Sequence, residues 1–247
     1  MRDLIHFLIV AACLGAMTTK GTHMGKRLEN AKKEIDSTKK YTIEEAIALA
    51  KKTATTKFTG NVEVHVRLGI DPKKSDQAIR NTITLPHGSG KKKRIIAFVT
   101  EAKEKEATDA GASIVGGEDL IKKLKETEAI DFDIAIAEPA MMAKLAVVAK
   151  LLGPRGLMPN PKTGTVTADI GKAIKEYSAG KVEFKNDDSG NIHLTIGKSE
   201  LTDAQILENY KAFMEVLKAA RPATIKNEFI SGITLNATMG PGIKVQQ

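Results

Sequence analysis

Ile95-Ile96-Ala97-Phe98-Val99 is an unbroken apolar run, and the pattern of this 247-residue chain changes there. An apolar strand without polar alternation is typical of a parallel sheet that is covered on both faces. From this run to residue 179, short apolar strands alternate with helical segments. The alternation predicts a parallel sheet with crossover helices, which is a three-layer α/β fold of Rossmann-like pattern. In chain order we expect strand 95–99, helix 101–110, strand 112–115, helix 119–125, strand 132–137 and helix 139–152.

The segments on either side of this region have a different pattern. Residues 62–68 alternate Val, Glu, Val, His, Val, Arg and Leu, which predicts a half-buried strand. Thr42 and Glu45 have the spacing of a capping box, so a helix is expected to begin there. The remaining expected elements are a helix over 24–38, a strand near 81–85, a hairpin around the turn 186–190, a helix over 202–219 and a strand over 230–235.

The two outer segments therefore resemble each other more than either resembles the middle. We expect a discontinuous two-layer α+β domain, made of 17–88 plus 180–247, with an α/β domain inserted at 89–179. The connections would form a hinge near 86–90 and 178–181. Two sequential domains are the alternative.

The first 16 residues do not match the rest of the chain. Residues 4–16 are almost entirely apolar, which is too short for a membrane span but long enough for the core of a signal peptide. Asp3 cancels the charge of Arg2, so the charged start of a signal peptide is poor. We interpret 1–16 as an extraneous or signal-like segment, with Met17 or Met24 as the true start; a secreted lipoprotein is the alternative.

The charge of the chain is unevenly distributed. The formal net charge is +8, and residues 17–88 hold 14 Lys and Arg against 8 Asp and Glu, whereas 180–247 hold 8 of each. A local basic excess indicates a localised contact with a polyanion such as RNA. The single Cys excludes a disulfide framework and a cysteine-rich zinc site, and favours a cytosolic protein.

Residues 153–167 form the most conspicuous loop, with three prolines, three glycines, Arg155 and Lys162. Proline fixes φ and lacks an amide hydrogen, so the loop is expected to be stiff and ordered. It resembles a Walker A loop superficially, but Pro161 replaces the glycine before Lys162. A nucleotide-binding loop, a rigid loop without chemistry and an RNA-contacting loop all remain open here.

Other chemistry is poorly supported by the sequence. The five His are scattered without metal-ligand spacing, and His65 and His193 are interpreted as surface residues on strands. No nucleophile elbow, zinc-binding helix motif or dinucleotide fingerprint is present. We therefore predict no catalytic residues, no cofactor and no metal. The run 91–94 is basic, and either an RNA-phosphate contact or a solvated linker would explain it.

Better candidates lie in the outer segments. Lys57 and Phe58 precede the strand 62–68, and Phe58 could lie in a core or offer its ring to a base or sugar. Thr238, Met239 and Gly240 follow the last strand, where a glycine allows close approach of a backbone. Hydroxyl and amide groups at such ends suit the 2′-hydroxyls and phosphates of RNA.

These blocks carry a family resemblance that covers nearly the whole chain from about residue 25. They are 57–58, 62–65, 68–72, 85–88, 153–165 and 238–241. In this order they resemble the large-subunit ribosomal protein of the L-one family, in its bacterial type. The resemblance implies the fold expected above and a non-enzymatic protein of the cytoplasm. It implies binding to large-subunit ribosomal RNA in the mobile stalk, and contact with exit-site tRNA to assist its release once deacylated. It also implies possible repression of its own messenger RNA, no membrane contact and a monomer within the ribosome.

The resemblance also implies which residues contact RNA, namely Lys57, Phe58, Asn61, Glu63, Thr238, Met239 and Gly240, with Lys162, Gly164 and Thr165 as weaker candidates. Two departures change the expected contacts. Asn61 occupies a position that is often Thr, and Ser231 and Gly232 fall where the family often offers a hydroxyl. The first 16 residues have no counterpart in the family.

Overall fold

The computed structural model describes residues 26–36, 38–72, 74–90, 93–100, 103–127, 130–222, 224–225 and 228–246. The predicted signal-like segment 1–16 lies outside the described residues. Within the described part, no helix is both long and apolar enough to cross a membrane.

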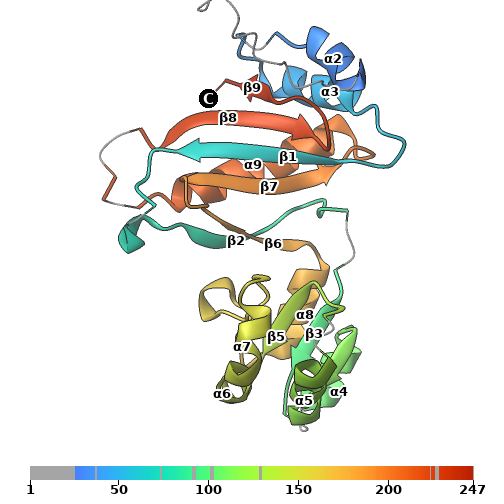
Figure 1. Ribbon diagram of the computed structural model, residues 1–247, viewed down its shortest axis with the longest axis vertical. Coiled ribbons are helices and arrows are strands. Elements are labelled where there is room, and N and C mark those ends of the chain that lie inside the picture. Colours follow the sequence, from blue (N-terminus) through green and yellow to red (C-terminus); the bar gives the residue numbers. More distant parts are fainter. Residues whose placement is uncertain are drawn as a thin grey trace, which may run out of the picture.

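A four-stranded antiparallel sheet forms the upper half of the molecule in Figure 1. Its order is β7 (Asn191–Lys198), β1 (Asn61–Leu68), β8 (Ile230–Ala237) and β9 (Ile243–Val245). The predicted alternation of β1 is confirmed, because Val62, Val64 and Val66 are fully buried. The strand β9 was not predicted, since its three residues are too few to show a period.

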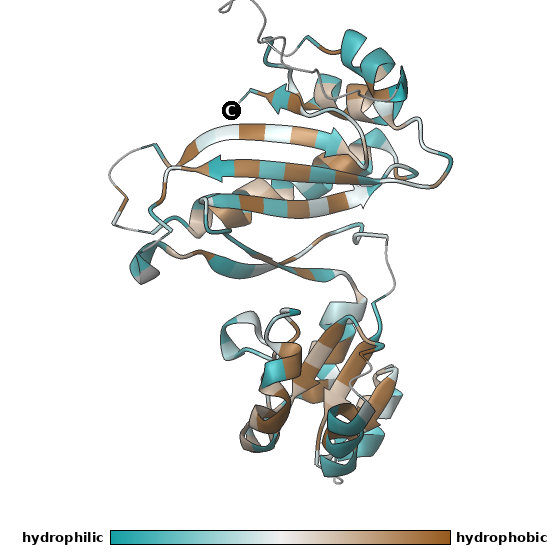
Figure 2. Cartoon of the chain, in the orientation of Figure 1, coloured by the Kyte–Doolittle hydropathy of each residue, from teal (hydrophilic) through white to brown (hydrophobic). Residues whose placement is uncertain are grey.

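Two helices cover one face of this sheet, α3 (Ile43–Thr53) and α9 (Asp203–Ala219). The predicted capping box of Thr42 and Glu45 is present, and Thr202 caps α9 in the same way. The shorter helix α2 (Lys26–Lys33) lies near α3. Among the described elements, no helix lies over the other face of the sheet. This face turns toward the viewer in Figure 2, where polar residues alternate with apolar ones along the strands. We call it the open face.

A two-stranded ribbon of β2 (Arg80–Thr84) and β6 (Lys181–Lys185) lies between the two halves (Figure 1). The hairpin predicted around 186–190 is wrong in its pairing, because β6 pairs with β2 whereas β7 pairs with β1. The two arms are joined close to the turn, by the bridge between Asn186 and Ile192 and by the hydrogen bond from the Asp187 amide to the Asn191 carbonyl at 2.8 Å. Alternation showed that both segments are strands, but it carries no information about which strand is the partner.

The lower half is built on a parallel sheet of order β4 (Ile114–Gly116), β3 (Ile95–Phe98) and β5 (Ile134–Ala137). One face packs against α4 (Glu104–Asp109) and α8 (Ile170–Ser178). The other packs against α5 (Glu118–Thr127) and the helical turns after β5. The expected parallel sheet with helices on both faces is confirmed.

Two details of this region differ from the expectation. A parallel bridge between Ala137 and Val166, which was not expected, adds to the edge of the sheet beside β5. The helix expected over 139–152 is broken into short turns: 3₁₀ turn Pro139–Met141, α6 (Met142–Leu145), 3₁₀ turn Ala146–Val148 and α7 (Ala149–Leu152). Val147 and Val148 stand at the break, where β-branched side chains disfavour a regular helix.

The buried residues fall into separate cores. One core combines residues from 41–85 with residues from 184–245, and two smaller cores line the faces of the parallel sheet within 95–177. The chain passes between them beside the ribbon, where Gly180 has φ +111° and a Cβ there would lie 2.9 Å from the Cα of Gly88. The mixed α/β character of the fold is thus confirmed, whereas the domain boundaries stay a prediction.

Candidate nucleic-acid interface

The start of β1 and the end of β8 are tied together. Because the two strands are antiparallel neighbours, Asn61 and Thr238 meet at one end of the sheet. The amide of Asn61 donates to the Thr238 hydroxyl at 2.8 Å, and the Thr238 amide donates to the Asn61 carbonyl at 2.9 Å. The Thr238 hydroxyl in turn donates to that carbonyl at 3.2 Å. We call this end, with residues 57–61 and 238–240, the β1–β8 rim.

Met239 projects from a strained turn at this rim. Its φ of 60° is the only positive value among the described non-glycine residues. Such a conformation is unfavourable for a side chain, and it persists where surrounding contacts hold it. The Gly240 amide donates to the Ala237 carbonyl at 2.7 Å, which closes the turn. Met239 is nonetheless 63% exposed, so the turn holds an apolar side chain in contact with solvent.

Lys57 and Phe58 lie in the loop between α3 and β1. Phe58 is 54% exposed, which decides between the two interpretations of its ring: it is not in a core. The Thr56 hydroxyl donates to the Phe58 carbonyl at 2.8 Å, and the Ser199 amide donates to the Gly60 carbonyl at 2.9 Å. The loop is therefore fixed to its neighbours while the Phe58 ring and the Lys57 side chain stay exposed.

Glu63 lies two residues after Asn61 in β1, on the open face. In the strand register it is opposite Thr195 and Asn236. Gly232 lies on the same face opposite Arg67, and a Cβ there would meet nothing within 4 Å. The hydroxyl that the family resemblance places at this position is therefore missing, and open space takes its place.

The other predicted contacts, Lys162, Gly164 and Thr165, are not brought to the β1–β8 rim. Their loop lies beside β2, away from the end of the sheet where β1 begins (Figure 1). Thr165 is only 7% exposed, and its hydroxyl donates to the Asn160 carbonyl at 3.1 Å. It also accepts from the Asn160 amide at 2.7 Å. Lys162 is exposed, and Gly164 ends a short turn with φ 71°.

Tyr177 anchors the same loop from α8. Its hydroxyl donates to the Thr163 carbonyl at 2.7 Å, and both residues are buried. Burial, aided by the charge of Glu183, raises the pKa of Tyr177 to about 12. The hydroxyls of Thr163 and Thr165 in the loop 153–167 are thus directed into the protein.

The basic run 91–94 is only partly described, because Lys91 and Lys92 lie outside the described residues. Lys93 donates to the Lys181 carbonyl at 3.1 Å, and burial lowers its pKa. Arg94 pairs with Asp133 at 3.5 Å, and the hydrogen bonds from Arg94 lower the pKa of that carboxyl. The described half of the run therefore interacts within the protein.

Arg27 is a residue of the rim that the sequence did not reveal. Its guanidinium, carried by α2, donates to the Met239 carbonyl at 2.8 Å. The charged helix 24–38 was recognisable from sequence, but no local pattern links two residues 212 positions apart. This hydrogen bond adds a cation to the rim and helps to hold Met239 in its strained conformation.

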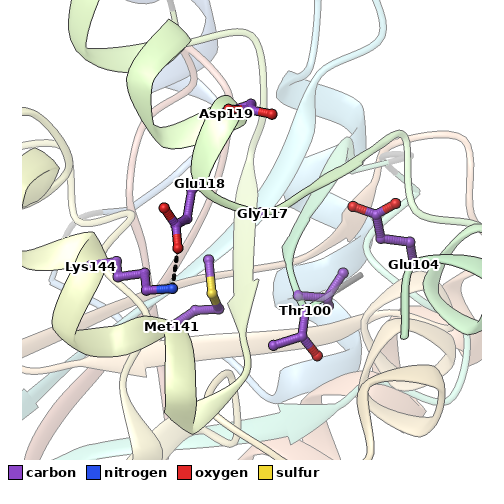
Figure 3. Close-up of a pocket in the computed structure, with 8 residues that line it drawn as sticks. Thr100, Glu104, Gly117, Glu118, Asp119, Met141 and Lys144 are labelled. Atoms are coloured by element: carbon purple, nitrogen blue, oxygen red, sulfur yellow. Dashed lines mark hydrogen bonds and ion pairs between the residues drawn. The ribbon is translucent and has the colours of Figure 1, made fainter. Parts of the chain in front are cut away.

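Figure 3 shows a pocket at the carboxyl ends of β3 and β4, the place where open α/β sheets commonly bind ligands. Its charged lining is mainly acidic, with Glu104, Glu118 and Asp119. The lining cation Lys144 is paired with Glu118. Such a lining repels phosphate groups, so the pocket does not support nucleotide binding.

Histidines do not form a metal site in the described part of the chain, where no cluster of potential ligands is found. His65 and His193 face each other on the open face, with their Nδ1 atoms 2.7 Å apart. His193 is exposed and His65 is partly exposed, in line with their interpretation as surface residues.

Comparison with known proteins gives a consistent result. The sequence model described as "Ribosomal protein L1p/L10e family" matches residues 50–241. A protein of Mesoplasma florum named large ribosomal subunit protein uL1 is 49% identical over 223 residues, which are 90% of this chain and 98% of the relative. Proteins with the same name from Mycoplasma capricolum and Thermosipho africanus are 49% and 48% identical, over 90% and 89% of this chain and 98% and 95% of their own lengths.

Proposed function

Because the chain belongs to the ribosomal protein L1p/L10e family, we propose that it binds large-subunit ribosomal RNA through the β1–β8 rim. Members of this family are structural proteins of the ribosome, and the chain is not an enzyme. The relatives are named as proteins of the large ribosomal subunit, which supports the same location for this chain. It would act there in the cytoplasm as a single copy within the particle.

The observation that carries this proposal is the pair of exposed apolar side chains on a rigid rim. Phe58 and Met239 are among only four large apolar side chains exposed in the described part of the chain. Ring faces and soft thioether groups stack on bases and sugars, and cations beside them attract phosphates. Lys57 and Arg27 provide such cations here.

The rest of the rim suits recognition of RNA by shape. Backbone groups and hydroxyls at Asn61, Thr238 and Gly240 are fixed by internal hydrogen bonds before any ligand arrives. A pre-ordered surface loses little entropy on binding, which favours tight and geometry-specific contact. Glu63 would accept hydrogen bonds from 2′-hydroxyls, which distinguish RNA from DNA.

The loop with Lys162 and Gly164 is proposed only as a secondary contact. Lys162 is the exposed cation of that loop, whereas the Thr165 hydroxyl is already used by Asn160. Through this and the rim the protein would form the mobile stalk, contact exit-site tRNA and assist release of deacylated tRNA. Repression of its own messenger RNA would use the same rim on a similar RNA structure.

The domain arrangement is part of the proposal. The shared core of 41–85 and 184–245 supports a discontinuous RNA-binding domain, 17–88 plus 180–247, with 89–179 inserted. The close approach of Gly180 to Gly88, where a Cβ on Gly180 would lie 2.9 Å from the Gly88 Cα, supports joining the two ends directly. Deleting 89–179 is expected to leave RNA binding largely intact in a filter or calorimetric assay. A folded remnant that has lost binding would contradict this arrangement.

The function is tested by binding residues 17–247 to the stalk junction of large-subunit ribosomal RNA across a salt series. A scrambled duplex of equal length is the control. We expect tight binding that prefers the junction and persists at physiological salt. Weak binding that is equal for both RNAs and vanishes with salt would reduce the chain to a basic surface and refute the proposal.

A further inference from the structure

The open face of the four-stranded sheet contains a hollow at the end opposite the β1–β8 rim. Three cations line it: Lys40 from the segment before α3, Arg67 near the end of β1 and Lys244 of β9. The polar groups that complete the lining are Asn191, Ser231, Thr234 and the two histidines, with a cavity volume of about 530 Å³. No Asp or Glu is among the lining residues.

Within the part of the chain that the structure describes, Lys40, Arg67 and Lys244 have no anionic partner. Among the residues that the structure describes, none of their side chains forms an ion pair. All three residues are exposed. Three like charges around one hollow repel each other, and a bound anion removes that repulsion.

The strand register brings Arg67 and Lys244 to the same part of the open face. Arg67 lies opposite Gly232 of β8, and Lys244 of β9 lies opposite Thr234. The space beside Arg67 is empty at Gly232, since a Cβ built on this glycine would meet nothing within 4 Å. The missing side chain therefore leaves the floor open for a ligand group.

The histidine pair forms a fixed wall of the hollow. His65 approaches His193 through Nδ1 at 2.7 Å and Asn236 Oδ1 through Nε2 at 3.0 Å. His193 also lies 3.5 Å from Asp187 Oδ2, and that carboxylate is held by Ser189 and Asn191. Among the described contacts, Asp187 forms no ion pair with Lys40, Arg67 or Lys244.

The hollow is continuous with the rim through one strand. Every second residue of β1 from Asn61 to Arg67 lies on the open face, and the six steps between these two residues cover about 20 Å at ~3.3 Å per residue. No helix covers this face. An RNA strand anchored at the rim can thus run along the sheet to the hollow.

We infer that Lys40, Arg67 and Lys244 form a phosphate-binding subsite that extends the RNA interface along the open face of the sheet. The inference rests on the proposed RNA-binding function. The ligand group is a backbone phosphate, since three cations and several hydrogen-bond donors line the hollow and no carboxylate does. The subsite supplies affinity and orientation rather than sequence preference.

The test uses the full chain with Arg67→Gln and Lys244→Gln, each bound to the stalk-junction RNA across a salt series. Loss of one phosphate contact should lower the slope of log affinity against log salt by about 0.7–0.9 and weaken binding about fivefold at physiological salt. Arg67→Lys keeps the charge and should retain the wild-type slope. Lys211→Gln, an exposed cation on α9 behind the sheet, is the matched control and should leave slope and affinity unchanged.

The outcomes separate this inference from the proposed function. If the wild-type chain shows no preference for the junction, the proposed function itself fails. If the wild-type chain binds and Met239→Asp weakens binding while Arg67→Gln and Lys244→Gln match the wild type, only the subsite is refuted. NMR of His65 and His193, during separate titrations with inorganic phosphate and with RNA, tests whether the hollow binds the RNA backbone or only free phosphate. Resonances that move with phosphate but not with RNA would refute the subsite, whereas movement with RNA supports it.

Discussion

The β1–β8 rim and the loop 153–167 both contain threonine, glycine and lysine, but these residues have opposite roles in the two places. At the rim, backbone hydrogen bonds and Thr238 hold an exposed Met239 in a strained turn. In the loop, Thr163 and Thr165 are buried, and their hydroxyls bond to each other and to Asn160. A conspicuous sequence can therefore stabilise the inside of the protein, whereas the rim that we propose for RNA binding has a much less conspicuous sequence.

The largest expected effect comes from Met239→Asp at the rim. A charge placed where RNA covers the surface loses its hydration without a partner, so binding should weaken by ~2 kcal/mol or more. Affinity for the stalk-junction RNA measures this, and circular dichroism checks the fold. Val147→Asp alters a similarly exposed apolar side chain in the other half and should leave affinity unchanged. If a folded Met239→Asp variant bound the RNA as tightly as the wild type, Met239 would not lie in the RNA interface.

Tyr177→Phe tests the loop as a brace. The change leaves the Thr163 carbonyl without its buried donor, so unfolding free energy should fall by about 1–3 kcal/mol. Chemical denaturation provides the measurement. RNA affinity should change little, because the rim is untouched. A large loss of RNA affinity without a loss of stability would show that the loop is the main binding surface instead.

The pH dependence of stability sharpens the same point. Burial raises the pKa of Tyr177 to about 12, above the value near 10 for an exposed tyrosine. The folded state therefore holds this proton more tightly, and its contribution is complete below pH ~10 and lost as the pH rises toward ~12. Unfolding free energy should decline over this window, and Tyr177→Phe should decline less. If the unfolding free energy of the wild type and of Tyr177→Phe declined equally over this pH range, the raised pKa of Tyr177 would be contradicted.

The smallest expected effect is that of Arg27→Gln. The substitution removes one cation and weakens the charged hydrogen bond to the Met239 carbonyl, so RNA binding should fall by about 1 kcal/mol. Lys26→Gln on the same helix removes an equal charge without that contact and is the control. If both variants lose the same affinity, Arg27 acts only through its charge and does not position the turn.

Much of the fold was predictable because hydrophobic period reports burial directly. The alternation of Val62, Val64 and Val66 predicted β1, and the apolar run 95–99 predicted the buried β3. The partner of a strand is decided by contacts far along the chain, which explains the wrong hairpin around 186–190. The breaks after Pro139 depend on packing as well as propensity and were missed for the same reason.

The sequence by itself determined the elements, the basic excess before residue 88 and the family, and so also which residues were candidates for RNA contact. Tertiary structure alone decided which of them share a surface. It joined Asn61 to Thr238, placed Arg27 on Met239 and turned Thr165 inward. It also gathered Lys40, Arg67 and Lys244 around one hollow. The physical reason is that local propensity acts over a few residues, whereas antiparallel pairing brings together groups that are separated by most of the chain.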